Sequence, residues 1–251
     1  DLTDLVSGGW VESPEDVVRE AQALLTSEAI LADRVIVLTA GSTDKAILED
    51  SLSLLAPHIR DYFSFMDFEG AKVAGGAGAL ASTLKAFIGA GIINRIVAVF
   101  DNDTAAAEAI GALAQVPLPS NFAILQYPRL RMLEAYPTLG PTGIAFADVN
   151  GVAASIELYL GRDVLADGEG SLLPVQWRGY NTSLGRYQGE VMRKSVIHSR
   201  FRAKVARCRI DENARAEADW SGLESIIASL KRALGDTAAG TLIAFERQER
   251  P

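Results

Sequence analysis

The segment Ile96-Val-Ala-Val-Phe-Asp-Asn-Asp103 decides the fold of this chain. Five apolar residues without a charge are typical of a buried strand, and Asp101 and Asp103 stand where that strand ends. Two carboxylates so close together repel each other unless a cation or protons compensate them. An isolated Asp-x-Asp is also typical of a helix N-cap, and Asp103 or Thr104 is placed to cap a helix that begins near Ala105.

Further apolar runs lie on both sides of this segment, and helical patterns separate them. We expect strands over residues 35–38, 62–68, 96–100 and 122–126, and helices over residues 46–55, 79–88 and 105–113. Strands that alternate with helices of this length form right-handed βαβ units. The sequence therefore predicts an α/β fold with a parallel sheet that helices cover on both faces. Functional side chains are expected at the carboxyl ends of the strands, in residues 39–44, 70–78 and 101–103.

The regions outside this pattern divide the chain into three parts. Residues 1–33 predict an N-terminal helical segment, residues 34–165 the α/β domain, and residues 166–251 a mostly helical C-terminal extension. Within these parts we expect a helical stretch over 148–160, a long helix over 188–208 and a last helix over 221–234. The chain begins with Asp1 and not with Met, which we interpret as a piece of a longer protein with further domains or a partner protein.

Composition limits the classes of protein that fit. A chain of 251 residues with 49% hydrophobic residues is long enough to bury a large core. The single cysteine, Cys208, excludes a disulfide framework and a cysteine-rich zinc site. No apolar run is long enough to cross a bilayer, and no signal peptide precedes the fold, so we expect a cytoplasmic protein without a membrane partner. A net charge of −8 argues against a uniformly basic surface for nucleic acid.

The order of the motifs resembles the Toprim domain, which topoisomerases, bacterial primases, recombination mediators and OLD-family nucleases share. The resemblance covers residues 34–127: an apolar strand, Ala40-Gly-Ser-Thr-Asp44 opening a helix, the pair Gly75-Gly76, and the strand that ends at Asp101. Short segments such as Asp148-Val-Asn-Gly and Ile156-Glu-Leu-Tyr-Leu resemble segments of the HEPN/Toprim-associated proteins of bacterial defence. The resemblance implies a Rossmann-like Toprim fold and an antiviral nuclease that uses Mg²⁺ or Mn²⁺ to cleave nucleic acid.

One departure from the Toprim pattern affects the central residue of the motif. Where the family has a glutamate that acts as general acid, general base or metal ligand, this chain has Ala40. A natural non-catalytic variant and an introduced glutamate-to-alanine substitution both explain this, and the survival of Asp44, Asp101 and Asp103 favours the substitution. The resemblance therefore implies a catalytic site at position 40 with Asp44, Asp101 and Asp103, the three aspartates also holding the metal.

Residues further along the chain extend this site by analogy with OLD-type nucleases, which add acids and a lysine for two-metal cleavage. Asp148 and Glu157 are the candidate additional metal ligands, and Lys194 is the candidate catalytic lysine. Exposed positions on helices explain Glu157 and Lys194 equally well. His198 lies one helical turn beyond Lys194, and a lone surface histidine is more often inert.

A basic stretch suggests contact with the phosphate backbone of a nucleic acid. From Arg178 to Arg209 inclusive there are nine lysines and arginines and one acid, Glu190. Trp177 or Tyr180 is available for base stacking. The polar side of an amphipathic helix is the plainer explanation. The candidate nucleic-acid contacts are Gly75 and Gly76, which allow close backbone approach to phosphate, together with Arg178, Arg193, Lys194, Arg200 and Lys204.

Two other function classes remain open. Residues Gly76-Ala-Gly-Ala-Leu-Ala81 match the G-x-G-x-x-A pattern of a dinucleotide-binding Rossmann domain, in which Asp101 would hold a ribose hydroxyl. That alternative leaves Asp44 and Asp103 without a role. A non-catalytic Toprim module that binds nucleic acid or a partner protein would explain a native Ala40. For either class a homo-oligomer is a further possible assembly.

Overall fold

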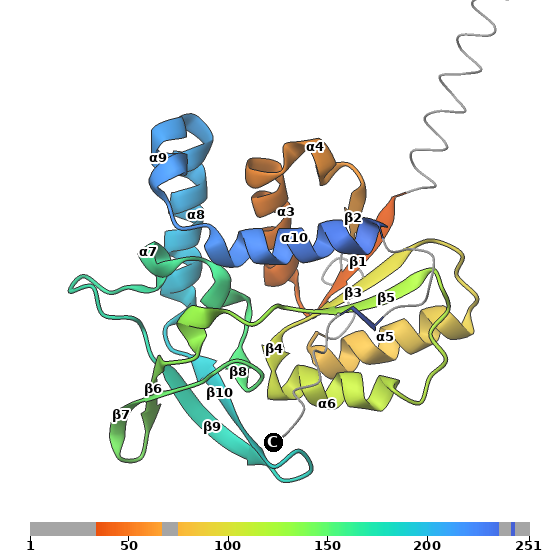
Figure 1. Cartoon of the computed structure of the whole chain (residues 1–251), viewed down its shortest axis with the longest axis horizontal. Coiled ribbons are helices and arrows are strands. Elements are labelled where there is room, and N and C mark those ends of the chain that lie inside the picture. The colour runs from red at the N-terminus through yellow and green to blue at the C-terminus, as the bar shows by residue number, and fades with distance from the viewer. Residues whose placement is uncertain (1–33, 67–74, 236–241, 244–251) are drawn as a thin grey trace, which may run out of the picture.

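The computed structural model describes residues 34–66, 75–235 and 242–243, which form two main sheets with helices packed around them (Figure 1). The predicted N-terminal helix within residues 1–33 lies outside the described residues, and so does the end of the predicted strand at 67–68. In the part of the chain that the structure describes, no helix is both long and apolar enough to cross a bilayer.

The main sheet is parallel, as the alternation of strands and helices predicts. Its strands are β1 (Val35–Thr39), β2 (Phe63–Phe65), β3 (Ile96–Phe100), β5 (Phe122–Gln126) and β11 (Leu242–Ile243). They lie in the order β11-β5-β3-β1-β2, and every neighbouring pair is parallel. The prediction of an α/β fold with a parallel sheet is therefore confirmed.

Helices cover both faces of this sheet. These are α3 (Ser42–Leu55), α5 (Ala77–Gly89), α6 (Thr104–Leu113) and α10 (Ser221–Gly235). Side chains of β1 alternate between the two faces, so that Val37 packs with α3 and α10 while Leu38 packs with α5 and α6. Figure 1 shows these two helix pairs on opposite sides of the sheet. Burial on both faces explains why the central strands are continuous apolar runs.

A second, mixed sheet joins the middle of the chain to the predicted C-terminal extension. It contains β6 (Tyr136–Gly140), β7 (Gly143–Ala147), β9 (Val175–Asn181) and β10 (Arg186–Val191), in the order β10-β9-β6-β7. The expected division at residue 165 therefore runs through this sheet. A short third sheet pairs β4 (Asn102–Asp103) with β8 (Ala153–Ala154).

The predicted helix over residues 188–208 is wrong in its first part. Residues up to Val191 belong to β10, and α8 begins at Lys194 and ends at Ile210. Gly189 explains the difference, because a Cβ there would lie 2.6 Å from Val175 and 3.0 Å from Trp177. Close packing of β10 against β9 therefore decides the local structure.

The predicted helical stretch over residues 148–160 is also wrong. Its residues form a turn at Gly151, where φ is 76°, then β8, and then the single 3₁₀ turn η2 (Ile156–Tyr159). Asn150 stabilises the turn, because its side chain bonds the backbone N–H and C=O of Leu130. The remaining helices are α4 (Pro57–Arg60), α7 (Arg162–Leu165) and α9 (Glu212–Glu217), with a 3₁₀ turn η1 (Arg131–Leu133).

Candidate functional site

Three aspartates from the predicted motifs lie at the carboxyl ends of the neighbouring strands β1 and β3. Asp44 is in the first turn of α3, which follows β1, and Asp101 directly follows β3. Asp103 is the N-cap of α6, and one of its carboxylate oxygens accepts a hydrogen bond of 2.7 Å from the Ala106 amide. The helix-cap interpretation of Asp103 is thus confirmed, and it is compatible with a place in the acidic site.

The charges of these aspartates influence one another. Burial, then the charge of Glu157, raises the pKa of Asp44 from 3.8 to about 7. Burial, then the charges of Asp44 and Asp103, raises the pKa of Asp101 well above its ordinary value. Burial also raises the pKa of Asp103, against the hydrogen bond from Ala106. These carboxyl groups are therefore harder to ionise than free aspartates, and protons or a cation would relieve their repulsion.

Glu157 joins this group from η2 and is buried. Its Oε1 lies 3.4 Å from Lys194 Nζ and 2.9 Å from His198 Nε2, and its Oε2 accepts a 2.5 Å hydrogen bond from the Ser155 hydroxyl. Burial alone would raise the pKa of Glu157, but Lys194, Ser155 and His198 hold it below its ordinary value. The exposed position considered for Glu157 is therefore wrong, whereas the Lys194 side chain is 35% exposed.

Lys194 lies between two acids at the start of α8. Its ammonium is 3.4 Å from Glu157 and 3.4 Å from Glu190, and these charges raise its pKa although burial lowers it. Its charge also lowers the pKa of Asp44 and Asp103. The charge of Lys194 therefore acts on several acids of this group, and its catalytic role stays a prediction.

Ala40 and the glycine pair meet beside this group. The Gly76 amide donates a 2.7 Å hydrogen bond to the Ala40 carbonyl, and a Cβ on Gly75 would lie 3.2 Å from the same oxygen. The two glycines therefore allow their own backbone to lie close to the residue that follows β1, Ala40. Position 40 follows β1, and Asp101 follows the neighbouring strand β3. A longer side chain at position 40 would therefore begin near Asp101.

Asp148 has partners of its own. Its carboxylate lies 2.6 Å from Arg129 and accepts hydrogen bonds from the amide and side chain of Asn150. These bonds and Arg129 lower its pKa although burial opposes them. Asp148 thus organises the turn before Gly151, and it is not among the charges that shift the other acids.

The basic residues of the C-terminal stretch divide into two groups. Arg200 binds the carbonyls of Val164 and Ala166, and Lys204, whose side chain is 7% exposed, binds Asp163 and two carbonyls. These two are therefore structural. Arg178 forms an ion pair of 3.4 Å with Glu190, and Arg193 and Arg186 are exposed.

The acidic group does not form a complete set of metal ligands in the part of the chain that the structure describes. Across residues 34–66, 75–235 and 242–243, no three His, Cys, Asp or Glu side chains are grouped so that they could hold a metal ion. One carboxylate oxygen of Asp101 accepts a bond from the Ile156 amide, Glu157 is bound on both oxygens, and Ala40 offers no ligand. The surplus of negative charge fits a cation, but the ligand set is incomplete with alanine at position 40.

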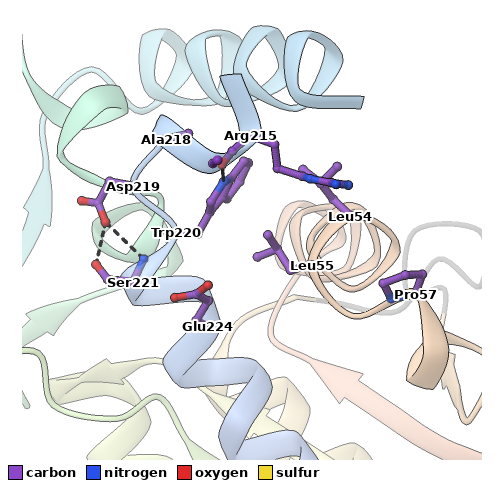
Figure 2. Close-up of a pocket in the computed structure, with 10 residues that line it drawn as sticks. Leu54, Leu55, Pro57, Arg215, Ala218, Asp219, Trp220, Ser221 and Glu224 are labelled. Carbon is purple, nitrogen blue, oxygen red and sulfur yellow. Dashed lines mark hydrogen bonds between the residues drawn. The ribbon is translucent and has the colours of Figure 1, made fainter. Parts of the chain in front are cut away.

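A pocket lies elsewhere, between α3, α9 and α10 (Figure 2). Leu54, Leu55 and Trp220 form its apolar wall. Two of its polar side chains are engaged within the protein, since the indole N–H of Trp220 donates to the Arg215 carbonyl and the Asp219 carboxylate accepts from Ser221. The acidic group, and not this pocket, is therefore the candidate functional site.

No protein-family model, curated protein or solved structure matches this chain. The resemblance to Toprim therefore depends on the motifs and on the arrangement of their side chains. Two residues of that arrangement escaped prediction. A lone histidine such as His198 is more often inert, and its shared helix face with Lys194 was the available signal; Arg186 was not singled out within the basic stretch.

Proposed function

We propose that this protein, with glutamate at position 40, is a Toprim-type nuclease that hydrolyses phosphodiester bonds with Mg²⁺ or Mn²⁺. The observation that carries the proposal is the meeting of Asp44, Asp101 and Asp103 with Glu157 and Lys194, which come from distant parts of the chain. A group with surplus carboxylates and one lysine suits the binding of a divalent cation beside a phosphate. The narrower resemblance supports a role in antiviral defence.

Each residue has a role in this proposal. A glutamate at position 40 and the three aspartates would hold the cation, and the bound cation would supply an acidic water and positive charge for the leaving oxygen. Lys194 places a positive charge beside the scissile phosphate. Glu157 holds Lys194 in position through their 3.4 Å ion pair, with His198 on the same carboxylate oxygen.

The dinucleotide alternative is less well supported. In a Rossmann domain the glycine motif follows the first strand, but here Gly41 occupies that place and Gly76 opens α5 after β2. The carboxylate of Asp101 accepts a hydrogen bond from Ile156 and lies among other acids, which is a poor setting for a ribose hydroxyl. A non-catalytic binding module is the stronger second candidate, and the incomplete ligand set favours it.

The decisive experiment restores the missing ligand. The Ala40→Glu protein is incubated with single-stranded and duplex DNA and RNA in the presence of Mg²⁺ or Mn²⁺. We expect cleavage that requires the metal and that disappears in the Ala40→Glu protein carrying Asp101→Asn.

The matched control is Ala40→Gln, which adds similar bulk without a charge. Folding of each variant is checked by circular dichroism. If Ala40→Glu is folded and cleaves none of these substrates, the nuclease assignment is wrong and the binding module remains. Cleavage that survives Asp101→Asn would show that the roles assigned to these residues are wrong.

A further inference from the structure

The hairpin of β9 and β10 exposes aromatic side chains. Tyr180 is 54% exposed and Tyr187 is 58% exposed, and their rings contact edge to face with centroids 5.0 Å apart. Trp177 extends this row, with its ring 5.8 Å from that of Tyr187. Aromatic rings in a row on an exposed sheet are the usual platform for stacking unpaired bases.

This row lies beside the acidic group. The Thr104 hydroxyl donates a 2.7 Å hydrogen bond to the Tyr187 carbonyl, and Thr104 directly follows Asp103. Strand β10 packs against β8 and α6, the two elements that hold the Asp101–Asp103 segment (Figure 1). A strand of nucleic acid stacked on the tyrosines would therefore pass close to the carboxylates.

Arg186 supplies positive charge between the tyrosines and the acids. A Cβ placed on Gly151 would lie 4.0 Å from Arg186 Nη1 and 3.9 Å from Asn102 Oδ1, so the guanidinium lies near the segment that carries Asp101 and Asp103. Within the part of the chain that the structure describes, Arg186 forms no ion pair. An exposed arginine without an acid partner is available for a phosphate.

We propose that Tyr180, Tyr187 and Arg186 form a binding surface for unpaired nucleotides, with bases on the rings and a phosphate on the guanidinium. This inference depends on the proposed nuclease function and names its substrate class as single-stranded nucleic acid. Bases inside a duplex are already stacked and hide their faces, so only unpaired bases can use the rings. The combination of exposed rings with an exposed arginine favours nucleic acid, because it offers both a stacking surface and a phosphate contact.

Binding tests the surface without any catalysis. The chain as it stands, with Ala40, is titrated without divalent metal against fluorescent single-stranded DNA and RNA of about 12 nucleotides and against a blunt duplex of the same length. We expect tighter binding of the single strands. The Tyr180→Leu/Tyr187→Leu protein should bind them at least about tenfold more weakly, since each stacked base contributes a factor of that order. Arg186→Gln should weaken binding and its dependence on salt.

The matched control is Phe146→Leu, because Phe146 is 73% exposed on β7 at the far edge of the same sheet. It should bind as the parent does. Equal binding of duplex and single strands, or unchanged binding after the double tyrosine substitution, would overturn the inference. The inference would also be overturned if sedimentation showed that the double tyrosine substitution changes the oligomeric state and that this change explains the whole loss of binding.

These outcomes are separable from those of the cleavage experiment. Metal-dependent cleavage by Ala40→Glu without any contribution from the tyrosines would leave the nuclease proposal intact and remove the stacking surface. Tyrosine-dependent binding of single strands without cleavage would support a binding module in place of a nuclease.

Discussion

Asp44→Asn should stabilise the protein at alkaline pH. The pKa of Asp44 is about 7 in the folded protein and close to 3.8 when the chain is unfolded. Folding therefore takes up a proton between these values, and the stability of the parent falls as pH rises from about 4 to about 7. At about 1.4 kcal/mol for each pH unit, the cost of the charged form has a ceiling of about 4 kcal/mol.

The expected gain is smaller than this ceiling. Neighbouring acids share the protons, and asparagine loses about 0.3–1 kcal/mol of favourable interaction with the N-terminus of α3. We expect a gain of about 1–3 kcal/mol at pH 8, which corresponds to a rise in Tm of about 2–12 °C for a chain of this size. At pH 4 the gain should vanish, because Asp44 is then protonated in the folded protein. Thermal unfolding followed by circular dichroism across this pH range measures the difference.

Asp61→Asn is the control, because Asp61 is exposed at the end of α4 and its ion-pair partner is the adjacent Arg60. It should change Tm little at either pH. The reasoning is refuted if Asp44→Asn lowers stability at pH 8, or if it raises stability by the same amount at pH 4 and pH 8.

Two further substitutions test the packing around the site. Gly222→Ala should lower the free energy of unfolding by about 1–3 kcal/mol in urea, because its Cβ would lie 2.5 Å from the Tyr159 carbonyl oxygen. Gly168→Ala meets nothing within 4 Å and should be nearly neutral, so equal effects would contradict the packing. Glu157→Gln removes the buried acid that pairs with Lys194 and should cost about 2–4 kcal/mol at pH 7 by thermal unfolding. An unchanged Tm would show that this ion pair does not stabilise the fold.

The main sheet is predictable from the sequence because its strands are buried on both faces. The runs at 96–100 and 122–126 contain almost no polar residue, and the structure has strands with those bounds. The hairpin of β9 and β10 is not predictable in this way. Its register depends on Gly189 packing against Val175 and Trp177, and the basic residues that follow are typical of a helix.

The candidate site likewise has residues that the sequence predicts and residues that it does not. Asp44, Asp101 and Asp103 follow strands that are adjacent in a parallel sheet, so the order of elements alone brings them to one edge. The contact between Glu157 and His198 joins residues 41 positions apart and depends on how η2 packs against α8. Arg186 reaches the same region only because β10 pairs with β9 and lies against α6. Single-sequence patterns contain no information on such contacts.

The most direct test of the central claim is the binding of Mn²⁺ to the folded Ala40→Glu protein, followed by electron paramagnetic resonance of the free ion. We expect one site that weakens strongly in the same protein carrying Asp101→Asn, and much weaker binding by the chain with Ala40. Binding of equal strength in all three proteins, or none in Ala40→Glu, would contradict a cation site built from these carboxylates.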